Sequence, residues 1–276
     1  MRRLSIFISV FLFLSLTFFS AHAQTTASSS QKVINGFARA VDVADGSVFI
    51  GEPDNAHQSG QVYIYRRGND GWSKHTQLAA SDGTVGDGFG SALTASDTSV
   101  LVGAPEVNDE RGAAYIFEKS GDGSWSESTR IALSDTSAEG KFGASVAQNG
   151  DLAFIGAPAE NDGHGAIYVY KRSGDSWTQQ AHIVNPDTAQ GFSFGTALAV
   201  DGDRLFVGAP EDKGGAVHVF TNDAGSWTKE TTLASRRVDE EASFGSTIAA
   251  RSNQVLIGSS AASSRFRCSI CVQPQR

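Results

Sequence analysis

The chain has 276 residues, of which 40% are hydrophobic and 19% charged, and its formal net charge at pH 7 is −8. A negative chain without a basic stripe argues against a nucleic-acid partner, because a phosphate backbone would be repelled. Its two cysteines, Cys268 and Cys271, stand among the last nine residues. The core therefore gains nothing from disulfides and must be stabilised by burial of apolar side chains.

The first 23 residues predict a cleavable secretory signal peptide. Arg2 and Arg3 give a positive start, residues 4–19 are apolar apart from Ser and Thr, and residues 21–23 read Ala-His-Ala. Small residues in this arrangement suit a signal peptidase. An uncleaved anchor is the alternative, although the apolar stretch is shorter than the ~20 residues of a spanning helix. We expect cleavage near Ala23, no transmembrane segment afterwards, and a secreted, periplasmic or cell-surface product.

From residue 24 to 258 the chain repeats a pattern every 50 to 53 residues. Each unit has a Phe beside a Gly and a second Gly fourteen positions later. The first four units also have a third Gly that opens an apolar-aromatic run, and a Trp. The Phe anchors are Phe37, Phe89, Phe142, Phe194 and Phe244, the second glycines are Gly51, Gly103, Gly156, Gly208 and Gly258, and the tryptophans are Trp72, Trp125, Trp177 and Trp227. Such regular spacing predicts a stack of equivalent structural units.

Four strands are expected in each unit, as the third unit illustrates. The first strand follows the Phe at 144–147, and the second, at 152–155, is apolar on both faces. The third, at 166–170, is rich in strand formers, and the fourth starts at Trp177 and alternates. Tight Gly-Asp and Asn-Gly turns join them in pairs. We predict an all-β fold, a β-propeller of four-stranded antiparallel blades with four full repeats and a partial fifth.

These anchors resemble the FG-GAP repeat, the blade unit of the integrin α-chain β-propeller and of many bacterial extracellular proteins. Gly-Ala-Pro is spelled out at 103–105, 156–158 and 208–210. The resemblance implies a ring of blades that binds partners outside the cell. Calcium-binding members of the family carry an Asp-x-Asp-x-Asp-Gly type loop, which here has shrunk to turns such as residues 149–151. Because calcium takes about six to eight oxygen ligands, we expect no metal site and no cofactor.

Residues 259–276 form a divergent or truncated tail. The third strand expected near Arg265 matches no earlier unit, although Phe266, Cys268, Ile270 and Val272 alternate as a strand would. Two arrangements are consistent with this end: an incomplete larger propeller, or a closed five-bladed ring in which residues 25–34 supply the missing outer strand. The Cys-x-x-Cys spacing could bind zinc or act in redox chemistry, but the chain offers no second ligand pair, which favours incidental cysteines.

No catalytic residue is predicted. The sequence has no Gly-x-Ser-x-Gly elbow, and no Ser, His and Asp set can be assembled from it without assuming arbitrary distances. His218 stands in the slot that Tyr63, Tyr115 and Tyr168 occupy in the other units. It is therefore interpreted as a substituted structural aromatic residue and not as a general base.

Antiparallel strands should bring the tight turns of each blade to one end and the longer, acidic loops to the other. Loops on a rigid scaffold commonly bind ligands. The candidate ligand-face residues are Asp54, Asp87, Glu106, Asp109, Glu160, Asp162, Glu211, Asp212, Asp239 and Glu240. We predict a non-enzymatic adhesion or binding module whose partner is an extracellular protein, a carbohydrate or a cationic ligand. The alternatives are loops that only solvate the protein, a propeller enzyme or accessory domain with a loop-built site, and a fragment of a longer propeller.

Overall fold

The computed structural model of the protein describes residues 36–53, 59–133, 139–186, 192–212, 214–234, 242–261 and 267–271. The expected signal peptide and the segment 25–34 lie outside these residues. No helix in the described ranges is long and apolar enough to cross a membrane. Almost all regular structure in these ranges is β-strand, which confirms the predicted fold class.

The strands form five antiparallel sheets that follow one another along the chain. The first sheet contains β1 (Val41–Ala44), β2 (Ser47–Glu52), β3 (Gln61–Gly68) and β4 (Gly71–Leu78). The second contains β5 (Ala92–Ala95), β6 (Ser99–Ala104), β7 (Ala113–Lys119) and β8 (Trp125–Ile131), and the third β9 (Ser145–Asn149), β10 (Leu152–Ala157), β11 (Ala166–Ser173) and β12 (Ser176–Val184). The fourth contains β13 (Ala197–Asp201), β14 (Arg204–Ala209), β15 (Ala216–Asp223) and β16 (Ser226–Ala234), and the fifth β17 (Ala242–Arg251), β18 (Gln254–Ala261) and β19 (Arg267–Cys271).

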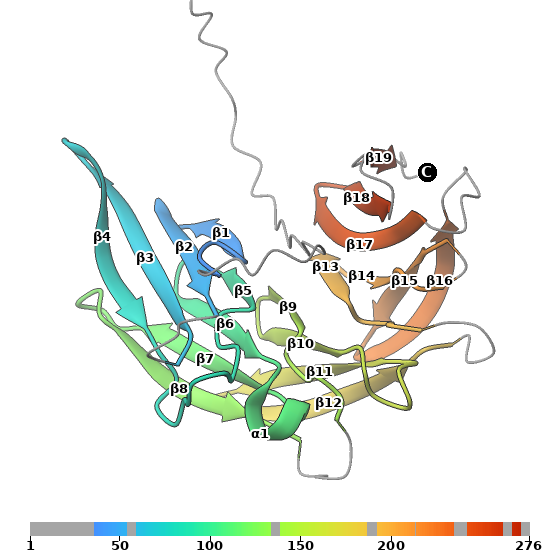
Figure 1. Cartoon of the computed structure of the whole chain (residues 1–276), viewed down its shortest axis with the longest axis horizontal. Helices are drawn as coiled ribbons and strands as arrows, with labels where there is room; N and C mark the ends of the chain where they lie inside the picture. The colour runs from blue at the N-terminus through green and yellow to red at the C-terminus, as the bar shows by residue number, and fades with distance from the viewer. Residues whose placement is uncertain are drawn as a thin grey trace, which may run out of the picture.

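Figure 1 shows these sheets standing side by side in an open arc, and in the first four sheets the first strand lies on the inside and the fourth on the outside. The sheets are blades of a propeller, but the first and fifth do not meet to close a ring. The fifth sheet has three strands in the described part of the chain, and its last strand, β19, falls in the predicted tail. The backbone there pairs with β18, from Ser259 opposite Arg267 to Val255 opposite Cys271. Residues 267–271 of the predicted tail thus form a paired strand.

Each Phe-Gly pair in the interior of the arc lies against the preceding sheet. A Cβ on Gly103 of β6 would overlap the carbonyl oxygen of Gly143, which belongs to the next sheet. The amide of Phe142 donates a hydrogen bond to the carbonyl of Arg111 at 3.1 Å. Gly143 has a φ of 91°, a value that L side chains rarely adopt. Both glycines are therefore required by a close approach of two backbones, one from each sheet.

The Phe rings fill equivalent positions between sheets. Phe142 is fully buried and meets Tyr168 edge-on, with ring centroids 5.4 Å apart. Phe89 and Phe194 are also fully buried, and each has two edge-on aromatic neighbours in its own sheet. Phe37 differs, because it is 48% exposed and precedes an Ala where the other units have a Gly. The first sheet has no preceding sheet within the described residues for its Phe to enter.

Candidate ligand-binding face

The longer connections of successive sheets touch one another at one end of the strands, which we call the loop face. The amide of Lys141, before the third sheet, donates to the carbonyl of Glu110 in the second at 2.8 Å. The amide of Ser193 donates in the same way to Gly163 at 2.7 Å. The two-residue turns, such as 150–151, lie at the opposite end, which we call the turn end. The loop face is thus a continuous surface made by several sheets.

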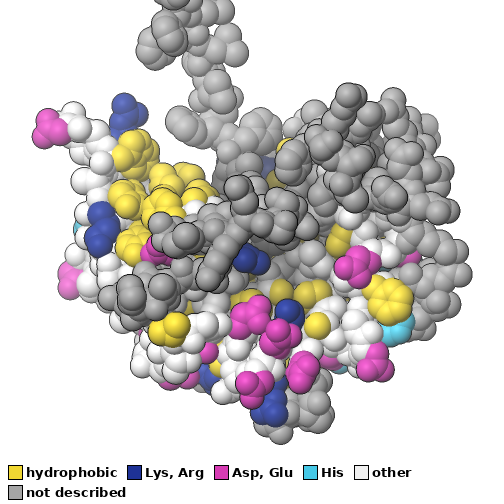
Figure 2. Space-filling view, in the orientation of Figure 1, with side chains coloured by type: hydrophobic (Ala, Val, Ile, Leu, Met, Phe, Trp, Pro, Cys, Tyr) yellow, Lys and Arg dark blue, Asp and Glu magenta, His cyan; other side chains and the backbone are white. Residues whose placement is uncertain are grey.

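A cavity of about 580 Å³ opens on the loop face of the second sheet. Its lining residues come from two loops and one outer strand, and they are Asp82, Thr84, Val85, Gly86, Asp87, Glu106, Val107, Asn108, Asp109 and Arg130. Figure 2 shows acidic side chains, together with some basic ones, gathered on the face in view over the region of α1 (Val107–Glu110). The balance of charge in the cavity is negative, so it suits a cationic or hydroxyl-rich group.

Arg130 is held at the edge of this cavity by a polar network. Its Nε lies 2.9 Å from Asp82 Oδ2, and it donates to the hydroxyl of Tyr115 at 3.3 Å. The same hydroxyl donates to Asp82 Oδ1 at 2.8 Å. Burial, reinforced by the hydrogen bond to Asp82, raises the pKa of Tyr115 to about 12. The tyrosine is therefore a neutral hydrogen-bond donor at physiological pH.

Two of the predicted ligand-face residues in this cavity, Asp87 and Glu106, interact with other side chains of the protein. The carboxylate of Asp87 accepts hydrogen bonds from the amide and the hydroxyl of Thr84, at 2.6 and 2.8 Å. Glu106 lies 3.9 Å from Lys141 Nζ, and Glu110 lies 3.4 Å from the same atom. Asp87 orders its own loop, and the lysine partly neutralises the two glutamates.

Asp109 and Asp162 are exposed, and the backbone projects them in the same way. Asn108 and Asp109 have φ values of 52° and 56°, and Asn161 and Asp162 have 54° and 57°. Such left-handed conformations cost about 1 kcal/mol or more for most residues but are tolerated best by Asn and Asp. The Asn-Asp pairs thus set a matching turn on two neighbouring sheets and point two carboxylates to solvent.

Glu160 is not a surface residue, although its sequence position suggested one. It is only 7% exposed, and its Oε1 lies 3.1 Å from His182 Nε2. The His182 ring stacks on Tyr168 with centroids 4.4 Å apart. The fourth sheet repeats the arrangement more loosely, because Asp212 Oδ2 lies 3.9 Å from Nε2 of buried His218.

The remaining predicted residues divide between exposed and undescribed positions. Glu211 is exposed beside Asp212. Asp54, Asp239 and Glu240 lie outside the described residues. In the part of the chain that the structure describes, no three His, Cys, Asp or Glu side chains gather in a way that could hold a metal ion.

Two residues of the loop face were missed by sequence reasoning, although the repeat contains a signal for them. Arg130 and His182 each come immediately before the apolar residue that ends the fourth-strand pattern, Ile131 and Ile183. In the sheets they stand opposite the aromatic slot of the third strand, Arg130 opposite Tyr115 and His182 opposite Tyr168. A polar residue at this position of the fourth strand thus lies opposite the aromatic residue of the third strand in the same sheet.

Comparison with known proteins agrees with the repeat geometry. The model of the family described as "FG-GAP repeat" matches residues 72–117, 125–170 and 177–220. The chain is an FG-GAP repeat protein. Each matched unit starts at a Trp on the outer strand of one sheet and ends on the third strand of the next sheet. The FG-GAP unit is therefore offset from the blade by one strand, so that consecutive units link neighbouring blades.

Two integrin α chains are similar to this FG-GAP protein. Integrin alpha-2 of Mus musculus is 26% identical over 149 residues, which is 48% of this chain and 12% of the integrin. Integrin alpha-4 of Xenopus laevis is 30% identical over 182 residues, which is 58% of this chain and 16% of the integrin. The chain thus matches less than a fifth of the length of either relative.

Proposed function

We propose that this protein is a secreted or cell-surface, non-enzymatic adhesion module whose loop face binds an extracellular protein or carbohydrate. The observation that carries the proposal is the alignment of acidic loops from successive FG-GAP blades on one continuous surface. Asp109, Asp162 and Glu211 are exposed there on the second, third and fourth sheets. Side chains that come from several blades can contact one ligand together, which favours recognition of an extended partner.

The charge of the loop face points to a partner with positive or hydroxyl-rich groups. Exposed carboxylates attract cationic groups over a Debye length of about 8 Å at physiological ionic strength. Arg130 and Lys141 are already engaged by Asp82, Glu106 and Glu110. Cationic groups of a partner would therefore meet the exposed carboxylates, while the paired Arg and Lys keep the loops in place.

The proposal is tested by binding to a panel of immobilised extracellular proteins and polysaccharides. The probe is the chain purified after export, and the triple variant Asp109→Asn, Asp162→Asn and Glu211→Gln removes three exposed carboxylates while keeping side-chain shape. For each panel member that binds, we expect the variant to raise Kd by about tenfold. Its dependence on salt should also become weaker, because screening acts on the charges removed.

A matched variant changes the turn end by the same amount of charge. Asp97→Asn, Asp151→Asn and Asp203→Asn neutralise three exposed carboxylates there. Binding of this variant should equal that of the wild type. An equal loss of affinity in both triple variants would show that binding depends on the net charge of the protein and not on the loop face. Absence of binding across the panel, or cleavage of glycans, esters or phosphodiesters above background, would contradict the proposal.

We further propose the boundaries of the exported protein. Residues 1–23 act as the signal peptide, residues 24–258 form the FG-GAP domain, and residues 259–276 form the tail. Expression of the full chain in a secreting host, followed by mass measurement of the product, should give the mass of a chain that starts at Gln24. A product that retains Met1 would contradict export by cleavage.

A further inference from the structure

The fifth sheet lacks an outer strand in the described part of the chain. The other four sheets each have a fourth strand, and each of these strands carries one of the four tryptophans. In the fifth sheet the order is β17-β18-β19, so no described strand pairs with the outer edge of β19. An open edge of this kind can accept another strand through backbone hydrogen bonds.

In the interior of the arc the tryptophan of the outer strand covers the preceding sheet. Trp125 of β8 meets Phe49 of β2 edge-on, with ring centroids 5.8 Å apart. Trp227 of β16 meets Phe154 of β10 in the same way at 5.3 Å. Phe49 and Phe154 are consequently buried to 1% and 0% exposure. An indole therefore completes each of these two junctions.

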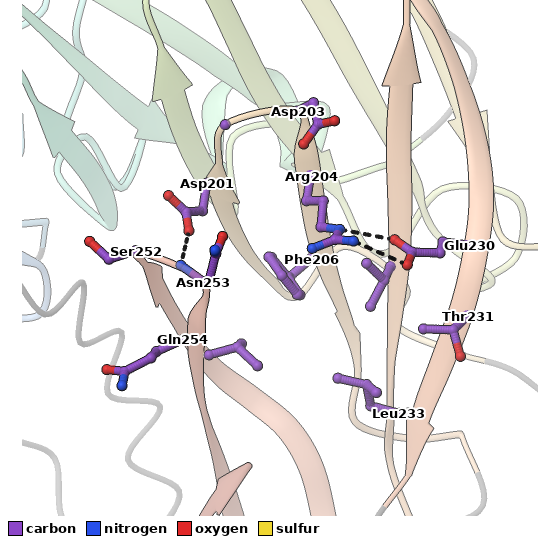
Figure 3. Close-up of a pocket in the computed structure, with 13 residues that line it drawn as sticks. Asp201, Asp203, Arg204, Phe206, Glu230, Thr231, Leu233, Ser252, Asn253 and Gln254 are labelled. Atoms are coloured by element: carbon purple, nitrogen blue, oxygen red, sulfur yellow. Dashed lines mark hydrogen bonds and ion pairs between the residues drawn. The ribbon is translucent and has the colours of Figure 1, made fainter. Parts of the chain in front are cut away.

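The junction between the fourth and fifth sheets has the same apolar positions but no indole among the described residues. Phe206 and Leu233 occupy the positions of Phe49 and Leu78 in the first sheet. They are only partly buried and line a cavity of about 610 Å³. Figure 3 shows both side chains at this cavity, below the rim formed by Arg204 and Glu230. The equivalent junctions show what fills such a space, namely a tryptophan ring.

The rim of the cavity adds a charge preference. Three carboxylates line it, those of Asp201, Asp203 and Glu230, against one guanidinium. Arg204 is paired with Glu230 through two contacts of 3.0 and 3.3 Å, and Asp201 accepts the amide of Asn253 at 2.8 Å. The surplus of acid favours a cationic residue beside the entering indole. Two outer strands of this chain have that combination, since Lys229 follows Trp227 by two residues and Lys74 follows Trp72 likewise.

We propose that the fifth sheet binds an extended segment of a partner polypeptide, which pairs with β19 and inserts a Trp, with a Lys or Arg nearby, into this cavity. A second copy of the chain is disfavoured as the donor, because its Trp125, Trp177 and Trp227 already pack against apolar clusters of its own sheets, which leaves the exposed Trp72 as its one candidate. The cavity is at the turn end, since the turns 202–203 and 252–253 form part of it. The inference is thus independent of the function proposed for the loop face.

The test uses a peptide with the sequence of residues 225–234, which is β16 with its preceding Gly, labelled with a fluorophore and titrated with the exported chain. We expect saturable binding that weakens by about tenfold or more when the Trp of the peptide is replaced by Ala, because buried aromatic residues dominate such contacts. Hydrogen exchange of the β19 amides should become slower when the peptide is bound.

Variants of the protein locate the site. Phe206→Ala should weaken binding of the peptide by about tenfold. Phe37→Ala, which changes an exposed aromatic residue on the first sheet, should leave binding unchanged. If circular dichroism shows that Phe206→Ala is unfolded, the comparison of the two peptides on the wild-type chain decides alone.

No saturable binding, equal binding of both peptides, or unchanged exchange at β19 would overturn the proposal. It would also be overturned by sedimentation showing a dimer that Phe206→Ala dissociates, since a second copy would then be the occupant.

Discussion

Two junctions of the arc use the same repeat positions but bury them to different extents. Between the third and fourth sheets, Phe154 is fully buried beneath Trp227. Between the fourth and fifth, Phe206 is only partly buried. The inner part of the junction is nevertheless alike in both, because a Cβ on Gly156 or on Gly208 would meet the backbone of the next sheet. A junction between two sheets therefore has two layers. In the inner layer, the Phe-Gly pair of one sheet contacts a glycine of the preceding sheet. In the outer layer, a tryptophan of the outer strand packs on an aromatic residue of the preceding sheet.

The inner layer should contribute most to stability. Phe142→Ala removes a fully buried ring between two sheets, and such a change costs about 3–5 kcal/mol. Phe37→Ala removes the equivalent anchor of the first sheet, which is 48% exposed, and should cost less than about 1 kcal/mol. The free energy of unfolding of both variants is measured by urea denaturation. Similar losses of unfolding free energy in the two variants would show that a Phe between two sheets contributes no more to stability than the exposed Phe37.

The glycines of the inner layer can be tested by adding a single methyl group. Gly103→Ala places a Cβ against the carbonyl of Gly143, so one backbone must move, and we expect a loss of about 1–3 kcal/mol. Gly121→Ala is the matched control, because a Cβ there meets no atom within 4 Å. Its effect should stay within about 0.5 kcal/mol. Thermal unfolding of the two variants gives the comparison, and a neutral Gly103→Ala would refute the close approach.

The repeat made the inner layer only partly predictable from the sequence. Its period predicted the strands, their order and the equivalence of Phe89, Phe142 and Phe194. The spacing of fourteen residues between Phe89 and Gly103 reflects a hydrogen bond within one unit, which the amide of Gly90, the residue after the Phe, donates to the carbonyl of Gly103 at 3.0 Å. The approach that excludes a Cβ comes from Gly143 of the next unit. A linear repeat does not show which of its identical units make contact in space.

The loop face was predictable in position but not in detail. Alternating turns and loops indicated the end of the sheets at which the acidic residues lie. They could not indicate that Glu160 is buried beside His182, or that the carboxylate of Asp87 accepts hydrogen bonds from Thr84, because acidic residues in loops look alike in sequence. For Glu160 the distinction depends on strand register, which places His182 opposite Tyr168 and so brings it to a glutamate 22 positions earlier in the chain. For Asp87 it depends on the shape of the loop, which folds back onto Thr84 three residues earlier.

The outer layer should contribute less than the inner one. Trp227→Ala removes an edge-on pair with Phe154 and opens the junction to water, which should cost about 1–2 kcal/mol. Trp72→Ala is the control, since Trp72 is 53% exposed on the first sheet, and its loss should be below about 0.5 kcal/mol. Urea denaturation of both variants measures the difference. A Trp72→Ala loss as large as that of Trp227→Ala would mean that the indoles act within their own sheets.

The smallest effect concerns the polar network at the loop-face edge of the junction between the first and second sheets. The pKa of Tyr115 is raised to about 12 from 10.0, chiefly by burial, so the neutral phenol is favoured in the folded state. Its stabilisation is fully present below about pH 10 and is lost as the pH rises through about 12.

Tyr115→Phe removes the hydrogen bond to Asp82 and should cost about 1 kcal/mol at neutral pH. Between about pH 10 and 12 the variant should lose less stability than the wild type, because it has one fewer phenol to ionise. Unfolding free energies across this range, with ultraviolet absorbance following phenol ionisation, test the prediction. Parallel pH profiles for the two proteins would show that ionisation of Tyr115 does not disturb the junction.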